Sequence, residues 1–163
     1  MEIYEIMNKM IAISEGNRHD INHFMKVYTY AKTIGESEHL DEKTLKTLEA
    51  AAIVHDIACP LCRVKYGNTN GKYQEAESRP LIREFFADTD LPDDMVERIT
   101  YLVEHHHTFR DITAMDHQIL VEADYLVNAD ESAYAEANIK NSLEKLFKTR
   151  TGISLLKSVY GLC

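Results

Sequence analysis

A single histidine-aspartate pair, His55-Asp56, interrupts an otherwise apolar run from Ala50 to Ala58. Burying an ionised carboxylate in such a run is unfavourable unless it is paired with a positive charge or coordinates a cation. The neighbouring imidazole is the commonest nitrogen ligand for a transition metal in proteins. The pair therefore indicates a metal site, and other residues of the chain must be able to reach it.

His23 and Asp124 are the best candidates to complete this site. His23 lies near the inward stripe of a predicted helix, and Asp124 lies in a second apolar run, Ile119 to Val127. With His55 and Asp56 they offer nitrogen and oxygen ligands that suit a divalent metal with positions left open for water and substrate. Water acidified by such a metal is the nucleophile that a hydrolase needs at neutral pH. A single buried histidine is more often a hydrogen-bonded core residue, but two carboxylates in apolar helices favour the metal interpretation.

The elements that must position these residues are helices. Apolar residues recur at three- and four-residue spacing, and six glycines and three prolines are few for 163 residues, so we expect an all-α fold. A polar loop is expected between Cys62 and Tyr73, with Pro60 ending the helix before it. The pattern predicts helices over residues 2–13, 17–37, 41–55, 74–87, 92–107, 115–129, 131–148 and 152–160.

Length and composition narrow the class of protein. A chain of 163 residues is most simply one domain, and no apolar run approaches the roughly 20 residues that span a bilayer. The net charge of -9 argues against a large nucleic-acid surface but not against a small phosphorylated substrate. Three cysteines are too few for a disulfide framework, and the acidic N-terminus lacks a signal-peptide pattern. We therefore expect a cytoplasmic protein with no membrane partner.

Four segments resemble, in order, the motifs of the HD-domain superfamily of metal-dependent phosphohydrolases. His19–Val27 matches a first helix of the form HDxxHxx(R/K)V, and Ile53–Ala58 matches the signature helix. Val103–Thr108 matches a helix end that often carries paired histidines, and Val121–Leu126 matches the helix that supplies the last aspartate. The matching segments span about residues 17 to 130.

The resemblance implies a single HD domain over residues 1–163, built as an all-α bundle of about six to eight helices. It implies a bound divalent metal ion, for which Mn, Fe, Zn, Mg, Ni and Co are candidates. The residues implied as metal ligands are His23, His55, Asp56 and Asp124. The residues implied to take part in catalysis are Asp56, His106, His107 and Lys26.

The catalytic assignments have simpler alternatives. His106 and His107 occupy the place of the family's His-His pair, where a second metal or the substrate phosphate is bound, but they could also form a solvated helix end. Lys26 stands where the family often has arginine. It could neutralise a substrate phosphate or lie on a solvated helix face.

Two departures from the family pattern bear on the chemistry. Two-metal members commonly carry another histidine after the HD helix, and Gly71–Glu77 has none, although Gln74 or Glu75 is a candidate substitute. The sequence therefore favours one metal over two. The pair Cys59 and Cys62 forms a CxxC, which we interpret as structural because no second pair exists to complete a zinc site.

The predicted activity is hydrolysis of a small phosphate ester by metal-activated water, with a nucleotide as one candidate substrate. This substrate class follows from the resemblance alone. Two other functions are compatible with the same scaffold. One is an HD-type di-iron oxygenase, against which the missing loop histidine argues mildly. The other is a non-catalytic regulatory module that binds a metal or a nucleotide.

Overall fold

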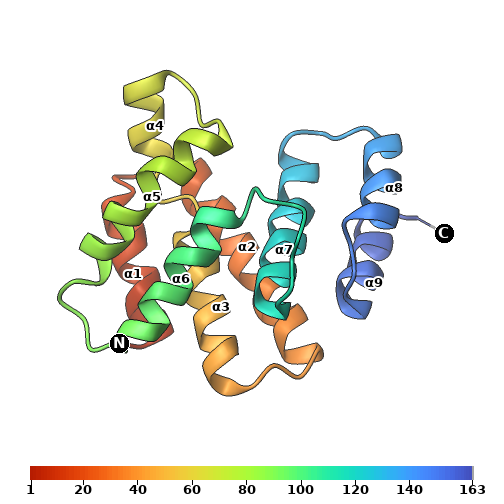
Figure 1. The fold of residues 1–163 in the computed structure, drawn as a ribbon. Coiled ribbons are helices and arrows are strands. Elements are labelled where there is room, and N and C mark those ends of the chain that lie inside the picture. The colour runs from red at the N-terminus through yellow and green to blue at the C-terminus, as the bar shows by residue number, and fades with distance from the viewer. Residues whose placement is uncertain (163) are drawn as a thin grey trace.

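The helical pattern extends over nearly the whole chain. In the computed structural model, which describes residues 1–162, the polypeptide forms α-helices and no strand (Figure 1). The predicted all-α class is therefore confirmed. In chain order the helices are α1 (Ile3–Ile13), α2 (Arg18–Ser37), α3 (Glu42–Val54), α4 (Cys59–Tyr66), α5 (Gly71–Phe86), α6 (Asp93–His105), α7 (Met115–Glu131), α8 (Glu136–Lys145) and α9 (Arg150–Val159).

Helix α4 is the element that the sequence pattern did not predict. It begins before the expected loop and fills its first part. Pro60 is its second residue, where a missing N–H is tolerated because the first amides of a helix have no intrahelical acceptor. Gly67, at a φ of 73°, adopts the left-handed conformation that ends the helix. The described residues thus contain nine helices, rather than the six to eight expected.

Helix α3 forms the centre of the bundle. Every residue from Thr47 to Val54 is buried, so protein surrounds this half of the helix on all sides. Helices α2 and α7 pack against α3 and also against each other. Side chains near the junction of these three helices can therefore meet, although they are far apart in the sequence.

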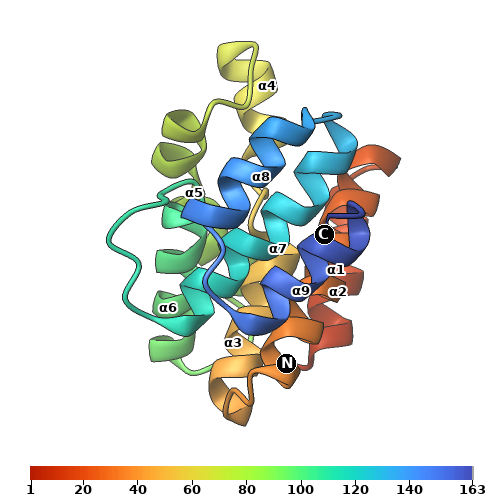
Figure 2. The same cartoon turned by 90° about the vertical axis from the view of Figure 1, so that its right-hand side faces the viewer.

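Helices α8 and α9 follow α7 and lie at one edge of the bundle in Figure 1; Figure 2 views the bundle from that side, with α8 and α9 in front of α7. Ile139 of α8 and Leu156 of α9 are buried in the same hydrophobic core as α3. Within residues 1–162, none of the helices combines the length and the apolar character needed to cross a membrane.

Glu122, a fully buried carboxylate of α7, fixes the start of α9. It accepts hydrogen bonds from the backbone N–H groups of Lys148 (2.6 Å) and Thr149 (2.9 Å). It also accepts from the Thr149 hydroxyl (2.5 Å) and the Gln118 side-chain amide (2.9 Å). The Thr149 hydroxyl oxygen in turn accepts from the N–H of Gly152 and caps α9. These donors satisfy the carboxylate, so its role is structural.

Glu122→Gln is expected to lower the free energy of unfolding by about 2 kcal/mol, because an amide nitrogen would then face buried N–H donors. Urea denaturation of the wild type and the variant measures the effect. Glu144→Gln, on the exposed side of α8, is the control with the same chemical change. Equal unfolding midpoints for wild type and Glu122→Gln would contradict this role.

Candidate metal centre

The His55-Asp56 pair lies just beyond the end of α3, not inside a helix as predicted. Helix α3 ends at Val54, and residues 55–58 form a turn before α4. The N–H of Ile57 donates to the carbonyl oxygen of Val54 at 3.0 Å, a three-residue spacing that is tighter than the four-residue spacing of an α-helix. The turn leaves the His55 side chain fully buried and the Asp56 side chain 25% exposed.

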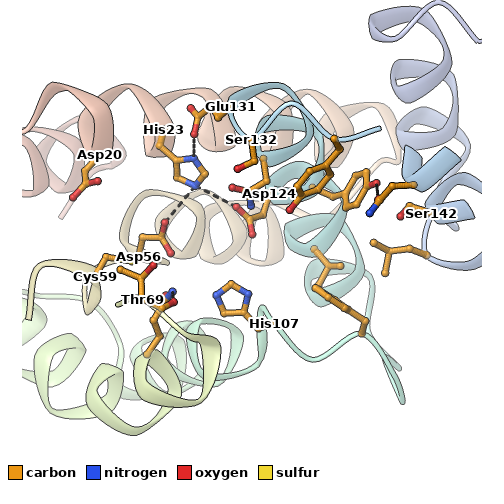
Figure 3. Close-up of a pocket in the computed structure, with 18 of the residues that line it drawn as sticks. Asp20, His23, Asp56, Cys59, Thr69, His107, Asp124, Glu131, Ser132 and Ser142 are labelled. Carbon is orange, nitrogen blue, oxygen red and sulfur yellow. Dashed lines mark hydrogen bonds and ion pairs between the residues drawn. The ribbon is translucent and has the colours of Figure 1, made fainter. Parts of the chain in front are cut away.

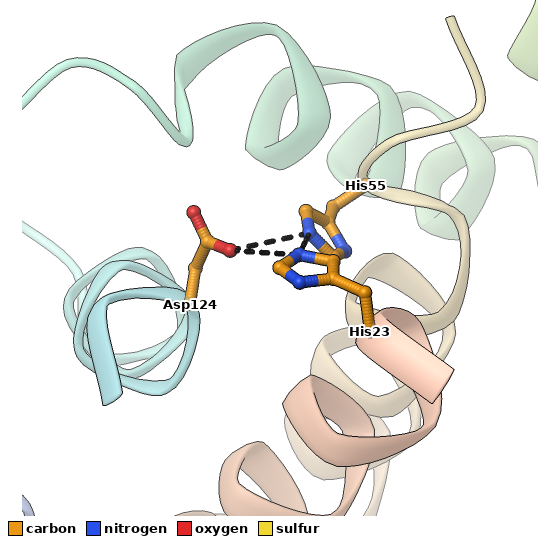
Figure 4. Close-up of side chains that lie close together, drawn as sticks. All are labelled: His23, His55 and Asp124. Carbon is orange, nitrogen blue, oxygen red and sulfur yellow. Dashed lines mark hydrogen bonds and ion pairs between the residues drawn. The ribbon is translucent and has the colours of Figure 1, made fainter. Parts of the chain in front are cut away.

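The structure brings together all four residues predicted as ligands. The Nε2 atoms of His23, in α2, and His55 lie 3.1 Å apart. Oδ1 of Asp124, in α7, lies 3.2 Å from the first nitrogen and 3.4 Å from the second (Figure 4). Oδ2 of Asp56 lies 3.3 Å and 3.5 Å from the same two atoms. We call His23, His55, Asp56 and Asp124 the HD cluster.

Hydrogen bonds on the far side of each ring orient the histidines. Nδ1 of His23 donates to Glu131 at 2.8 Å. Nδ1 of His55 and Nδ1 of His106 donate to backbone carbonyl oxygens three residues earlier, at 2.7 Å and 2.6 Å. Because Nδ1 carries the proton, Nε2 of each neutral ring presents a lone pair. This is the arrangement in which imidazole binds a metal ion.

The HD cluster has electron pairs that a cation would satisfy. With neutral rings, the buried Asp124 Oδ1 and His106 Nε2 have no hydrogen-bond partner among the described residues. Burial lowers the pKa of His23, but the hydrogen bond to Asp124 and the charge of Asp56 outweigh it and raise the pKa to about 9. A group that holds a proton this strongly occupies a site suited to positive charge. The nitrogen and oxygen donors of the cluster therefore fit a divalent metal ion.

His106 and His107, which follow the end of α6, lie beside the HD cluster. Nε2 of the buried His106 is 3.5 Å from Oδ1 of Asp56, and the His106 and His107 ring centres are 3.9 Å apart. Burial and the neighbouring His106 lower the pKa of His107 to about 4, so His107 is neutral at pH 7. Ligand atoms of His106, His107 and Asp124 lie within 4.8 Å of one another, close enough to hold a second ion. The preference for one metal over two stays a prediction.

A pocket of about 680 Å³ opens beside the HD cluster (Figure 3). His23, Asp56, Asp124 and His107 line it on one side, and its wall continues along α7 to α8. Since Asp56 is partly exposed and His55 is fully buried, a small molecule reaches the cluster from the Asp56 side. A bound ion would therefore keep open positions facing this pocket.

Gln74, one of the two candidates for the place of the missing histidine, lines this pocket. Its Nε2 donates to the carbonyl oxygen of Thr69 at 2.8 Å, which fixes the amide. Its Oε1 is buried and has no hydrogen-bond partner in the described part of the chain. Glu75 instead accepts a long hydrogen bond of 3.4 Å from Thr108. Of the two, Gln74 is the residue with an atom available to a ligand.

The CxxC cysteines do not add to the donors of the site. Cys59 and Cys62 are both buried and free of any disulfide. Burial raises the pKa of each thiol, and Asp56 raises that of Cys59 further. Protonated thiols are poor ligands and poor nucleophiles, which agrees with the structural interpretation.

Lys26 is held by Glu131, which the sequence pattern did not identify as part of the site. Its Nζ donates to Oε1 of Glu131 at 3.1 Å, and Lys26 is not among the residues that line the pocket. Glu131 lies seven residues after Asp124 in α7, so the two share a helix face, and its other oxygen accepts from His23. Lys26 therefore lies on the Nδ1 side of His23, away from the Nε2 atom that faces the HD cluster.

Glu131→Ala is expected to weaken metal binding by about tenfold to a hundredfold, because His23 would lose the acceptor that fixes its orientation. Isothermal titration of the metal-free protein with Mn²⁺ measures this change. Glu131→Gln keeps an acceptor oxygen and should recover part of the affinity. Glu136→Ala, an exposed carboxylate of α8, controls for lost negative charge. Equal affinities of Glu131→Ala and wild type would rule out the positioning role.

Comparison with known proteins supports the motif resemblance. The profile of the HD domain matches residues 20–141, which is more than half of the chain. This range extends from α2 into α8 and contains all four residues of the HD cluster. No curated protein and no solved structure matches the chain. The order of the motifs, the helical bundle and the family match together place this chain in the HD domain family.

Proposed function

We propose that this protein hydrolyses a small phosphate ester, and that His23, His55, Asp56 and Asp124 bind the divalent metal ion required for the reaction. The observation that carries the proposal is the convergence of the four ligands beside a pocket large enough for a small molecule, which His23, Asp56 and Asp124 line. When bound, such an ion lowers the pKa of a coordinated water and offsets the charge of the phosphoryl group.

The residues around the ion supply the proton chemistry. Burial raises the pKa of Asp56, but His55 and His106 outweigh it and hold the pKa below its ordinary value, so Asp56 is ionised at neutral pH. Its exposed edge faces the pocket and can accept a proton from an attacking water. His107, neutral and with an unpartnered Nε2 within the described residues, can form a hydrogen bond to the substrate from the wall of the pocket. Lys26 acts through Glu131 and makes no contact with the substrate.

We also propose that the chain works as one HD domain. Helix α1, which precedes the family match, contributes Ile6 and Met10 to the core, and α9, which follows it, contributes Leu156. Because these residues share one hydrophobic core with α3, the terminal helices are expected to unfold together with the rest.

The proposed activity is tested with metal-free protein reloaded separately with Mn²⁺, Fe²⁺, Zn²⁺, Mg²⁺, Ni²⁺ and Co²⁺. Phosphate release is then measured from a panel of nucleotides, sugar phosphates and p-nitrophenyl phosphate. We expect metal-dependent release from at least one class of ester, and loss of release in Asp124→Asn. If no ester is hydrolysed with any metal while a nucleotide raises the melting temperature, the protein is a regulatory binding module instead.

The second set of donors at His106 and His107 supports a second candidate, a di-iron oxygenase. Anaerobic reconstitution with Fe²⁺ separates the two chemistries. Loading with two irons per chain, followed by oxygen consumption with a substrate, would overturn the hydrolase proposal. The hydrolase proposal predicts phosphate release without oxygen consumption.

A further inference from the structure

Few cationic side chains line the pocket beside the HD cluster. When a metal ion replaces the proton of His23, the charged lining among the described residues comprises four carboxylates, Asp20, Asp56, Asp124 and Glu131, and two cationic side chains, Arg63 and Lys145. The chain as a whole is also negatively charged, with a net charge of -9. A bound divalent ion would bring the pocket close to neutrality, so a highly charged anion would find little further compensation there.

Arg63 already forms an ion pair with a carboxylate of the protein, that of Asp20. Its two terminal nitrogens donate to the two oxygens of Asp20 at 2.6 Å and 2.7 Å, a bidentate pair that joins α4 to α2. Lys145, at the end of α8, forms no hydrogen bond or ion pair within residues 1–162. Lys145 is therefore the one cation lining the pocket, among the described residues, that is available to an anionic substrate.

Apart from Asp124, Glu131 and Lys145, the residues of α7, α8 and the segment between them that line the pocket are uncharged, and most of them are polar. They include the amides of Asn128 and Asn141 and the hydroxyls of Ser132 and Ser142. Phe109 and Tyr134, which are 58% and 36% exposed, add aromatic surface to the pocket. Such groups hydrogen-bond and cover a neutral polar molecule, but they cannot neutralise a second phosphate.

From these contacts we propose that the site prefers phosphate monoesters of uncharged polar alcohols and disfavours polyphosphates and bisphosphates. The inference rests on the proposed phosphohydrolase function. The charge of a single phosphate group would be offset by the bound ion and, elsewhere along the lining of the pocket, by Lys145. Each additional phosphate would find no further free cation among the described lining residues, because Arg63 is already paired with Asp20.

Matched substrate pairs test this preference. The metal-loaded full chain is assayed with adenosine 5′-monophosphate, adenosine 3′,5′-bisphosphate and ATP, and with glucose 6-phosphate and glucose 1,6-bisphosphate, at one fixed free metal concentration. We expect kcat/KM for the monophosphate of at least one pair to exceed that of its more highly charged counterpart by about tenfold or more. An equal or higher kcat/KM for the bisphosphates or ATP would overturn the inference and leave the hydrolase function standing. Failure to hydrolyse any substrate, p-nitrophenyl phosphate included, would overturn both.

Variants of α8 test the part assigned to Lys145. Lys145→Gln should raise KM for the preferred monophosphate by roughly threefold to tenfold with little change in kcat, because only an exposed charge contact is lost. Lys140→Gln has the same change on the same helix, but Lys140 pairs with Glu136 and does not line the pocket. Asn141→Lys adds a cation one turn before Lys145 and should narrow the preference over the bisphosphate. Equal KM values for the two lysine variants, or an unchanged preference in Asn141→Lys, would contradict the assignment.

Discussion

Asp56→Ala is expected to abolish both metal binding and phosphate release while leaving the helical content largely intact. The variant removes a ligand atom that lies within 3.5 Å of both His23 and His55. It also removes the carboxylate edge that faces the pocket. We expect metal affinity to fall by at least about a hundredfold, since removal of a residue that only orients a ligand already costs tenfold or more. Titration with Mn²⁺ and far-ultraviolet circular dichroism measure the two properties.

Asp88→Ala is the control for this experiment. Asp88 is an exposed carboxylate in the turn between α5 and α6, so its loss changes the net charge by the same amount without touching the HD cluster. Metal binding and activity should match the wild type in this control. Wild-type metal stoichiometry in Asp56→Ala would be incompatible with the assigned ligand set.

Metal affinity is expected to rise steeply with pH. Hydrogen bonding to Asp124 and the charge of Asp56 raise the pKa of His23 from 6.5 to about 9 in the metal-free protein, so a proton competes with the metal ion for its Nε2. Between pH 6.5 and about 9 the affinity should increase by roughly tenfold per pH unit, and above that range it should level off. Titrations with Mn²⁺ across this range, in buffers of different ionisation enthalpy, also count the protons released.

The raised pKa of His23 also affects the folding stability of the metal-free protein. A raised pKa means that the folded state holds the His23 proton more tightly than the unfolded state. The resulting stabilisation is fully present below pH 6.5 and is lost as the pH rises to about 9. The metal-free protein should therefore become easier to unfold over this range.

A pH-independent metal affinity between pH 6.5 and about 9 would show that His23 is not a ligand.

Residue type and context identified the four residues of the HD cluster as candidates for a metal site. A carboxylate in an apolar run is expected to have a partner, and in the structure Asp56 and Asp124 both lie beside His23 and His55. Spacing alone did not show that His23, His55-Asp56 and Asp124 converge, and their joint role was implied by the family resemblance. In the structure α2, α3 and α7 pack against one another, which brings these residues together. The helical class followed from the spacing of apolar residues.

What the sequence did not predict depends on contacts between distant residues. The residues near Lys26 in the sequence do not show that Glu131, in another helix, accepts a hydrogen bond from Lys26. From the sequence alone, Lys26 could either neutralise a substrate phosphate or lie on a solvated helix face. Helix α4 was missed because it is short and contains Pro60, which usually ends a helix but is tolerated near its start.

The apolar run of α7 contains two carboxylates that differ in role. Glu122 faces α9 and is satisfied by backbone and side-chain donors, whereas Asp124 faces His23 and His55. Two residues apart on a helix, the two side chains point to roughly opposite sides. The sequence pattern marks both as buried, but only the packing of α9 against α7 shows which of them is structural.

The metal content of the purified protein tests the central claim most directly. Mass spectrometric analysis of metals in the wild type, in Asp56→Ala and in wild type treated with a chelator and reloaded would be compared. We predict at least one divalent metal ion per chain in the wild type and after reloading, and none in Asp56→Ala. A wild-type protein that is purified without metal and binds none of the six candidate ions on addition would contradict the account.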